Sequence, residues 1–172
     1  LLPHEGPTEV LSELSPAQKQ AFNQVNTYFD QGNVCLLHGI TSSGKTRVYM
    51  HLMQRFIAGG KQVLFIVPEI ALTTQLIMRL QRFYGSQVGV YHSRQTAAER
   101  VELFQKVKQG DPSVQIVVGA RSAVFLPFKD LGLVVLDESH EPSLKQHSPA
   151  PRYHGRDAAI MLAHLNGAKV LL

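Results

Sequence analysis

The chain has 172 residues, 44% of them hydrophobic, and this length suits a single domain with one buried core. The net charge of +4 is compatible with an anionic partner, but the basic residues are scattered and form no nucleic-acid-binding tail. A single cysteine, Cys35, excludes an internal disulfide and a cysteine-rich zinc site, and we expect it to be a buried thiol. No apolar stretch approaches the roughly 20 residues of a membrane span, so we expect a reduced, cytoplasmic protein with no membrane contact.

The two ends of the sequence indicate a piece of a longer protein. The chain begins without methionine and ends on the apolar run "AKVLL", with nothing after it to cover a strand. We expect residues 1–14 to be a lead or linker and residues 15–172 to be the folded unit.

Hydrophobic patterning predicts an α/β domain. Ser15 as N-cap and Pro16 at the first helical position predict a helix over 15–29. Short runs rich in Val, Ile and Leu, typical of strands covered on both faces, occur at 34–38, 62–68, 87–92, 114–119, 131–137 and 168–172. Segments of helical period lie between them at 47–59, 71–83 and 97–110. Strand followed by helix, repeated, predicts a mainly parallel sheet with helices on both faces, and the polar stretch 138–156 is a candidate functional loop.

The stretch "LLHGITSSGKT" carries a phosphate-binding pattern. Residues 39–46 fit G-x-x-x-x-G-K-[ST] between a predicted strand and a predicted helix, a context that favours a nucleotide site over a plain glycine turn. Glycines let backbone N–H groups turn inward around phosphate oxygens, and the helix beginning near Lys45 adds its positive end. We expect Lys45 to neutralise the β- and γ-phosphates and the Thr46 hydroxyl to bind Mg²⁺. The predicted nucleotide-binding residues are Gly39, Ile40, Thr41, Ser42, Ser43, Gly44, Lys45 and Thr46.

A pair of carboxylates follows another predicted buried strand, in "LGLVVLDESH". We expect Asp137 to hold Mg²⁺ opposite Thr46, and Glu138 to orient and deprotonate the water that attacks the nucleotide. Acidic residues after a strand are also common as loop or N-cap residues. Together with the phosphate loop, however, the pair indicates hydrolysis of a nucleoside triphosphate.

The box from Asp137 to His140 has the form D-E-x-H and resembles that of superfamily 2 helicases. The surrounding phrases resemble one family among them, the primosomal replication-restart helicases known as the primosomal protein N′ family. "LSPAQKQAF" is similar to the segment before the first strand, "LHGITSSGKTRVY" to motif I, "VLFIVPEIALTTQ" to motif Ia, and "VYHS" and "VVGARSAVFLPFKDLGLVVLDESH" to the segments up to motif II. "SLKQHSPAPRYHGRDAA" resembles an aromatic-rich loop that couples DNA binding to hydrolysis in this family. In that loop, Leu144, Ala150 and Pro151 stand where the family frequently has aromatics or glycine.

The resemblance implies that residues 15–172 are the first of two RecA-like P-loop NTPase lobes. The whole protein would be an ATP-dependent 3′-to-5′ DNA helicase of replication restart and primosome assembly, in which ATP hydrolysis is coupled to DNA translocation. Its implied cofactors are ATP and Mg²⁺, with zinc only in parts outside this chain. Its implied partners are DNA forks and single strands and, through the longer parent, primosome and single-strand-binding proteins. Because transition-state arginines come from the second lobe in this class, we expect the chain alone to hydrolyse ATP very slowly and to unwind nothing.

The resemblance also implies roles for residues outside the two motifs. Gln18 occupies the position of an adenine-contacting glutamine, and His140 would connect hydrolysis to nucleic-acid contacts. Arg121 and Ser122 would hold phosphates of a DNA strand, which positions a backbone without reading its sequence. The remaining candidates for DNA contact or coupling lie in the loop and are Lys145, Arg152, Tyr153 and Arg156.

Three alternatives remain open at this point. The chain could belong to another superfamily 2 DNA translocase, to a P-loop kinase, or to a non-catalytic module that binds a nucleotide. A kinase needs an acceptor pocket and usually a lid, whereas "VPEIALT" and "GARSA" favour a surface that follows a nucleic-acid backbone. ATP hydrolysis measured with and without branched or single-stranded DNA separates these alternatives.

Overall fold

The computed structural model describes residue 7 and residues 9–39 and 44–172. The predicted nucleotide-binding residues Ile40, Thr41, Ser42 and Ser43 therefore lie outside the described residues. None of the helices in the described ranges is long and apolar enough to cross a membrane.

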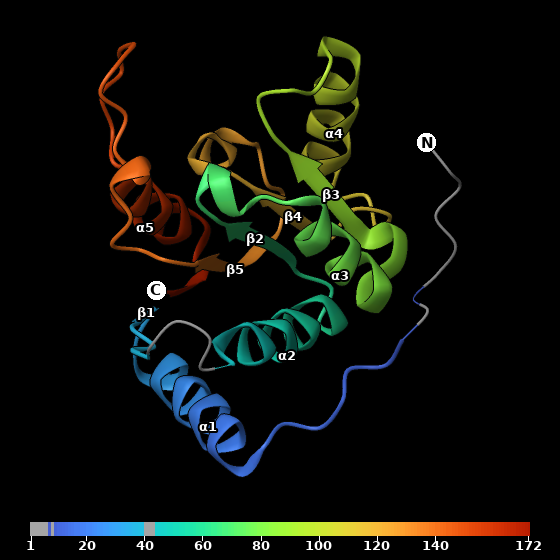
Figure 1. The fold of residues 1–172 in the computed structure, drawn as a ribbon, viewed down its shortest axis with the longest axis vertical. Helices are drawn as coiled ribbons and strands as arrows, with labels where there is room; N and C mark the ends of the chain where they lie inside the picture. Colours follow the sequence, from blue (N-terminus) through green and yellow to red (C-terminus); the bar gives the residue numbers. More distant parts are fainter. Residues whose placement is uncertain (1–6, 8, 40–43) are drawn as a thin grey trace.

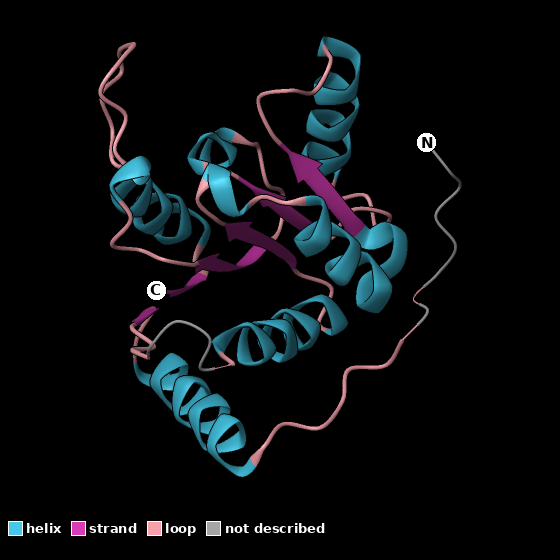
Figure 2. Ribbon diagram, viewed as in Figure 1, coloured by secondary structure: helices cyan, strands magenta, loops and turns pink. Residues whose placement is uncertain are grey.

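A six-stranded sheet forms the middle of the structure, with the strand order β1-β6-β5-β2-β4-β3. Every pair of neighbouring strands is parallel, which confirms the predicted parallel α/β sheet (Figure 2). The strands are β1 (Val34–Cys35), β2 (Gln62–Ile66), β3 (Val88–Tyr91), β4 (Ile116–Gly119), β5 (Leu131–Leu136) and β6 (Lys169–Leu171).

Five α-helices connect or precede these strands in the described part of the chain, namely α1 (Pro16–Gln31), α2 (Lys45–Ala58), α3 (Thr74–Tyr84), α4 (Ala97–Gln109) and α5 (Gly155–Asn166). Short 3₁₀ turns lie at η1 (Glu69–Ala71), η2 (Gly85–Gln87), η3 (Arg121–Phe125) and η4 (Pro142–Leu144). Ser15 caps α1 as predicted, because its side chain accepts from the Gln18 N–H and the Gln18 side chain accepts from the Ser15 N–H.

The sheet is covered on both faces, as the continuous apolar strands predict (Figure 1). In β2, Val63 and Phe65 pack with buried residues of α1, α2 and α3, whereas Leu64 and Ile66 pack with those of α4 and α5. This alternation follows from the pleat, which sends successive side chains to opposite faces of the sheet. Cys35, 7% exposed, belongs to the first of these two cores, so the prediction of a buried thiol is confirmed.

Two predictions of local structure need correction. The strand predicted at 34–38 ends at Cys35, because Cys35 lies opposite Leu171, the last residue of its partner β6. The stretch 138–156 is not wholly irregular: η4 lies within it, Lys145 and His154 form an antiparallel bridge, and α5 begins at Gly155. Between the two bridge residues the chain projects from the body as the orange hairpin in Figure 1.

Lys169 of β6 holds the end of α1, the helix that carries Gln18. Its ammonium donates to the carbonyl oxygens of Phe29 and Gly32 and to the Asn33 side-chain oxygen. The last carbonyls of a helix have no partner within the helix and carry partial negative charge, so a cation there both satisfies and stabilises them.

We predict that Lys169→Met, which keeps the side-chain stem, lowers the free energy of unfolding by about 1–2 kcal/mol, because it removes these charge-assisted bonds. Urea denaturation of the chain measures the difference. Lys106→Met is the matched control, since it removes only an exposed pair with Glu102 on one helix, worth about 0.3–0.5 kcal/mol. Equal losses for the two variants would contradict the capping role.

Candidate nucleotide and nucleic-acid site

The two halves of the predicted nucleotide site meet at the carboxyl edge of the sheet. Asp137 directly follows β5, and its N–H donates to the Ile66 carbonyl at the end of β2 over 2.9 Å. Lys45 and Thr46 begin α2, beyond the end of β1. A cavity of about 370 Å³ is lined from both sides, by Gly44, Lys45, Thr46, Arg47, Arg79, Asp137 and Glu138.

The Lys45 side chain spans the two described ends of the phosphate loop. Its Nζ donates to the Gly39 carbonyl oxygen over 2.9 Å. A second cavity of about 650 Å³ borders this contact and is lined in part by Gly39, Lys45, Glu138 and His140. Lys45 and Glu138 therefore belong to both cavities and mark where they adjoin.

Gln18 lies against the second glycine of the loop. Its Nε2 donates to the Gly44 carbonyl over 3.3 Å, while its Oε1 accepts from the Ser15 N–H over 3.0 Å. Gly44 has φ = +82°, and a Cβ at this position would lie 2.5 Å from the Gln18 Nε2. The backbone conformation therefore favours glycine here, and a Cβ would also push the Gln18 amide away from the loop.

Asp137 is a partly buried carboxylate that lies near charges of both signs. Burial and the neighbouring Glu138 raise the pKa of its carboxyl, while Lys45 and a hydrogen bond from the Tyr49 hydroxyl act in the opposite direction. Tyr49 is 2% exposed on α2, with its ring packed edge-on against Phe65. Sequence reasoning missed Tyr49, although its position one helical turn after Lys45 places it on the same side of α2.

Glu138 adopts a backbone conformation that is unusual for its residue type. Its φ is +52°, in the left-handed region, where a residue with a Cβ costs free energy and is seen mostly at functional positions. Its Oε2 lies 3.3 Å from the Nε2 of His140, whose side chain is 78% exposed. Glu138 and His140, which were predicted to have separate roles, thus contact each other and both line the 650 Å³ cavity.

Arg121 contacts the loop after the acidic box. Its Nη1 donates to the carbonyl oxygens of Ser143 and Lys145, and Leu144 between them is 1% exposed in the core. The guanidinium therefore ties η3 to the base of the loop. Ser122, the other residue predicted to hold a strand phosphate, is exposed next to it.

The remaining loop candidates gather near Arg121, with one exception. The half-buried Tyr153 packs edge-on against Phe125, with ring centroids 4.9 Å apart, and the Lys145 Nζ donates to the Arg152 carbonyl. Burial raises the pKa of the Tyr153 hydroxyl, and the nearby Arg121 partly offsets this. Arg156 instead lies in the first turn of α5 and pairs with Asp157.

Motif Ia and the segment after β3 form a hollow of their own at the same edge of the sheet. It measures about 710 Å³ and is lined by Glu69, Ile70, Leu72, Thr73, Thr74, Ile77, His92, Ser93 and Arg94. The Ser93 hydroxyl donates to the Glu69 carboxylate over 2.7 Å, which joins its two sides.

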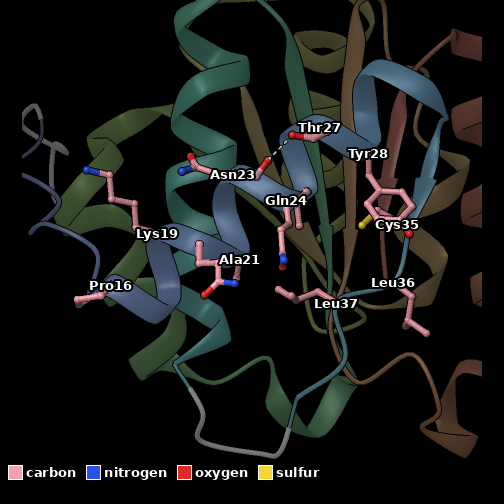
Figure 3. Close-up of a pocket in the computed structure, with 12 residues that line it drawn as sticks. Pro16, Lys19, Ala21, Asn23, Gln24, Thr27, Tyr28, Cys35, Leu36 and Leu37 are labelled. Atoms are coloured by element: carbon pink, nitrogen blue, oxygen red, sulfur yellow. Dashed lines mark hydrogen bonds between the residues drawn. The ribbon is translucent and has the colours of Figure 1, made fainter.

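Another hollow, of about 740 Å³, lies between α1 and β1 (Figure 3). It is lined by residues such as Lys19, Tyr28 and Leu36, and no acidic or histidine side chain is among those that line it. Its chemistry therefore does not suit phosphate hydrolysis, and the candidate site stays at the carboxyl edge.

We predict that Asp137→Asn raises the melting temperature of the chain at pH 7 without nucleotide or metal. The raised pKa means that the folded state disfavours ionised Asp137, so this unfavourable contribution is present above the folded pKa and fades as the pH falls toward the ordinary aspartate range. The uncharged amide introduced by Asp137→Asn does not make this unfavourable contribution. Thermal unfolding across a pH series checks this, and a gain that grows toward low pH would contradict it. Asp130→Asn, at an exposed pair with Lys61, is the control.

Comparisons with known proteins agree with this arrangement. Residues 15–161 match the family model of the DEAD/DEAH box helicases. The chain is 40% identical over 161 residues to the replication restart protein PriA of Bacillus subtilis, covering 92% of this chain and 20% of that protein. It is 42% identical over 160 residues to the PriA of a Synechocystis species, covering 93% of this chain and 19% of that protein. The chain thus spans about a fifth of the length of these relatives.

Solved structures with the same fold include RecG bound to a three-way DNA junction, with a TM-score of 0.68 and 21% identity over 98% of this chain and 23% of that one. The helicase Lhr of Mycobacterium smegmatis, bound to single-stranded DNA and AMP-PNP, has a TM-score of 0.66 and 20% identity. The match covers 92% of this chain and 22% of that one. With the family model matching most of its length, and with its loop and acidic box at one edge of a RecA-like sheet, this chain belongs to the DEAD/DEAH box helicase family.

Proposed function

We propose that this chain is the nucleotide-binding motor lobe of an ATP-dependent 3′-to-5′ DNA helicase that acts in replication restart and primosome assembly. The observation that carries the proposal is the cavity shared by Lys45, Thr46, Asp137 and Glu138, from two motifs that lie far apart in sequence. The relatives named as replication restart proteins support the biological role.

Different residues of this cavity would have different roles in phosphate hydrolysis. Lys45 has N–H donors beyond the one given to Gly39 and would hold phosphate oxygens. Glu138 would orient the attacking water and accept its proton. Glu138 lines both cavities, so it would be within reach of a nucleotide in either.

The donor set suits Mg²⁺, because a partly buried carboxylate and a hydroxyl line one cavity and Mg²⁺ prefers oxygen ligands. Thr46 and Asp137 would hold the ion, which neutralises phosphate charge when bound. Tyr49 would keep the Asp137 carboxylate in place through its hydroxyl.

A DNA strand would run along the carboxyl edge outside these cavities. RecG and Lhr, which share the fold, were solved with DNA. The hollow lined by Thr73, Thr74 and Arg94 has hydroxyl and guanidinium donors of the kind that hold phosphates. Binding of a DNA strand would change the position of Glu138 through contacts with Arg121, Ser122, His140 and the loop residues. Because arginines of a second lobe complete such sites, this lobe alone would turn over slowly.

We predict that the chain binds ADP with Mg²⁺ and that Lys45→Ala weakens this binding by about tenfold or more, the usual effect of losing a bond to a charged phosphate. Isothermal titration calorimetry measures both affinities. Lys61→Ala, at an exposed pair with Asp130, is the control and should bind as the parent chain does. Unchanged ADP binding by Lys45→Ala would contradict the assignment of Lys45 as a phosphate ligand.

The helicase role is tested in the full-length parent. We predict that single-stranded or forked DNA stimulates its ATP hydrolysis, and that Glu138→Gln abolishes hydrolysis while ATP binding persists, since the amide cannot accept the proton. A phosphate-release assay with and without DNA measures both. Hydrolysis stimulated by DNA without unwinding would favour another DNA translocase, whereas phosphate transfer to a small molecule without DNA stimulation would favour a P-loop kinase.

A further inference from the structure

Arg79 brings a cation to the hydrolytic cavity from an element that belongs to neither motif. It stands on α3, and its side chain lines the 370 Å³ cavity together with Thr46, Asp137 and Glu138. Arg79 is exposed, and within the described residues it has no hydrogen bond or ion pair. The neighbouring arginine on the same helix, Arg82, pairs with Glu9.

The cavity needs this charge once a nucleotide is present. Lys45, Arg47 and Arg79 provide three positive charges, and Asp137 and Glu138 provide two negative ones. Triphosphate with one divalent cation adds a net charge of about −2, so the filled site carries about −1 when all three cations take part and about −2 without Arg79. A guanidinium suits this place because its planar donors match two phosphate oxygens at once.

The position of Arg79 selects one phosphate among the three. It lines the cavity that contains Asp137 but not the larger cavity that contains Gly39 and His140. Glu138, which would hold the attacking water, must face the terminal phosphorus. Glu138 lines both cavities, but the proposed Mg²⁺ ligands Thr46 and Asp137 line only the smaller one, together with Arg79. The smaller cavity is therefore where the terminal phosphate and the attacking water would meet.

We propose that Arg79 is a ligand of the terminal phosphate, supplied by this lobe itself, so that the site distinguishes a nucleoside triphosphate from a diphosphate. The inference rests on the proposed nucleotide site. It also gives α3 a place in coupling, because Thr73, Thr74 and Ile77 at the start of this helix line the hollow along the strand path. The same helix would then border both the terminal phosphate and the 710 Å³ hollow.

The test compares two nucleotides on the chain by calorimetry with Mg²⁺, namely ADP and the non-hydrolysable β,γ-imido analogue of ATP. Arg79→Ala should weaken binding of the analogue by about tenfold or more while changing the ADP affinity by no more than about twofold. Arg79→Lys, which keeps the charge and loses the planar fork, should give an intermediate loss for the analogue alone. Arg82→Ala, one turn further along α3, should change neither affinity.

The outcomes separate this inference from the proposed function. Equal losses of affinity for both nucleotides, or no loss for the analogue, would overturn the role of Arg79. The proposed nucleotide site would still hold in that case if ADP binding depends on Lys45. If the parent chain bound neither nucleotide, the proposed site and the role of Arg79 would fall together. Thermal unfolding of each variant shows whether a loss comes from misfolding, and an analogue-specific loss in a folded variant supports the inference.

Discussion

The structure depends on the common direction of its six strands. Because all neighbouring strands are parallel, their carboxyl ends emerge at one edge, and the segments after β1, β2, β4 and β5 meet there. Backbone bonds continue past the strand ends, from Val67 N–H to the Gly119 carbonyl and from Asp137 N–H to the Ile66 carbonyl. These bonds fix the position of the acidic box relative to motif Ia before any side chain contributes.

A rigid core allows this edge to hold groups that are unfavourable individually. Asp137 is partly buried beside a like charge, and Glu138 has a left-handed backbone. Each of these features lowers stability, and two apolar cores on opposite faces of the sheet compensate. Such a conflict between local preference and global structure is typical of functional sites, where proteins give up stability for preorganised chemistry.

The sequence predicts those parts of the site that are local in the chain. The phosphate loop and the acidic box are recognisable because each needs fixed residue types at fixed spacing, and the strands because they are continuously apolar. Tyr49 and Arg79 escape prediction, since what matters is their approach to Asp137 and Glu138 across the fold. The helix α5 escapes as well, because it begins directly after a polar, proline-bearing loop with His154 as an uncommon N-cap.

Hydrogen bonds to backbone carbonyls hold the loop after the acidic box in place. Arg121 and Lys145 donate to backbone carbonyls, those of Ser143, Lys145 and Arg152, so the acceptors persist whatever side chain those positions carry. At the base, the two donor side chains and the buried Leu144 are constrained. So are Tyr153, which packs on Phe125, and Gly155, where an added Cβ would lie 3.0 Å from the Arg121 Cβ. Positions of the hairpin tip other than Arg152 and Tyr153 can therefore differ in sequence while these backbone bonds still hold the base of the loop.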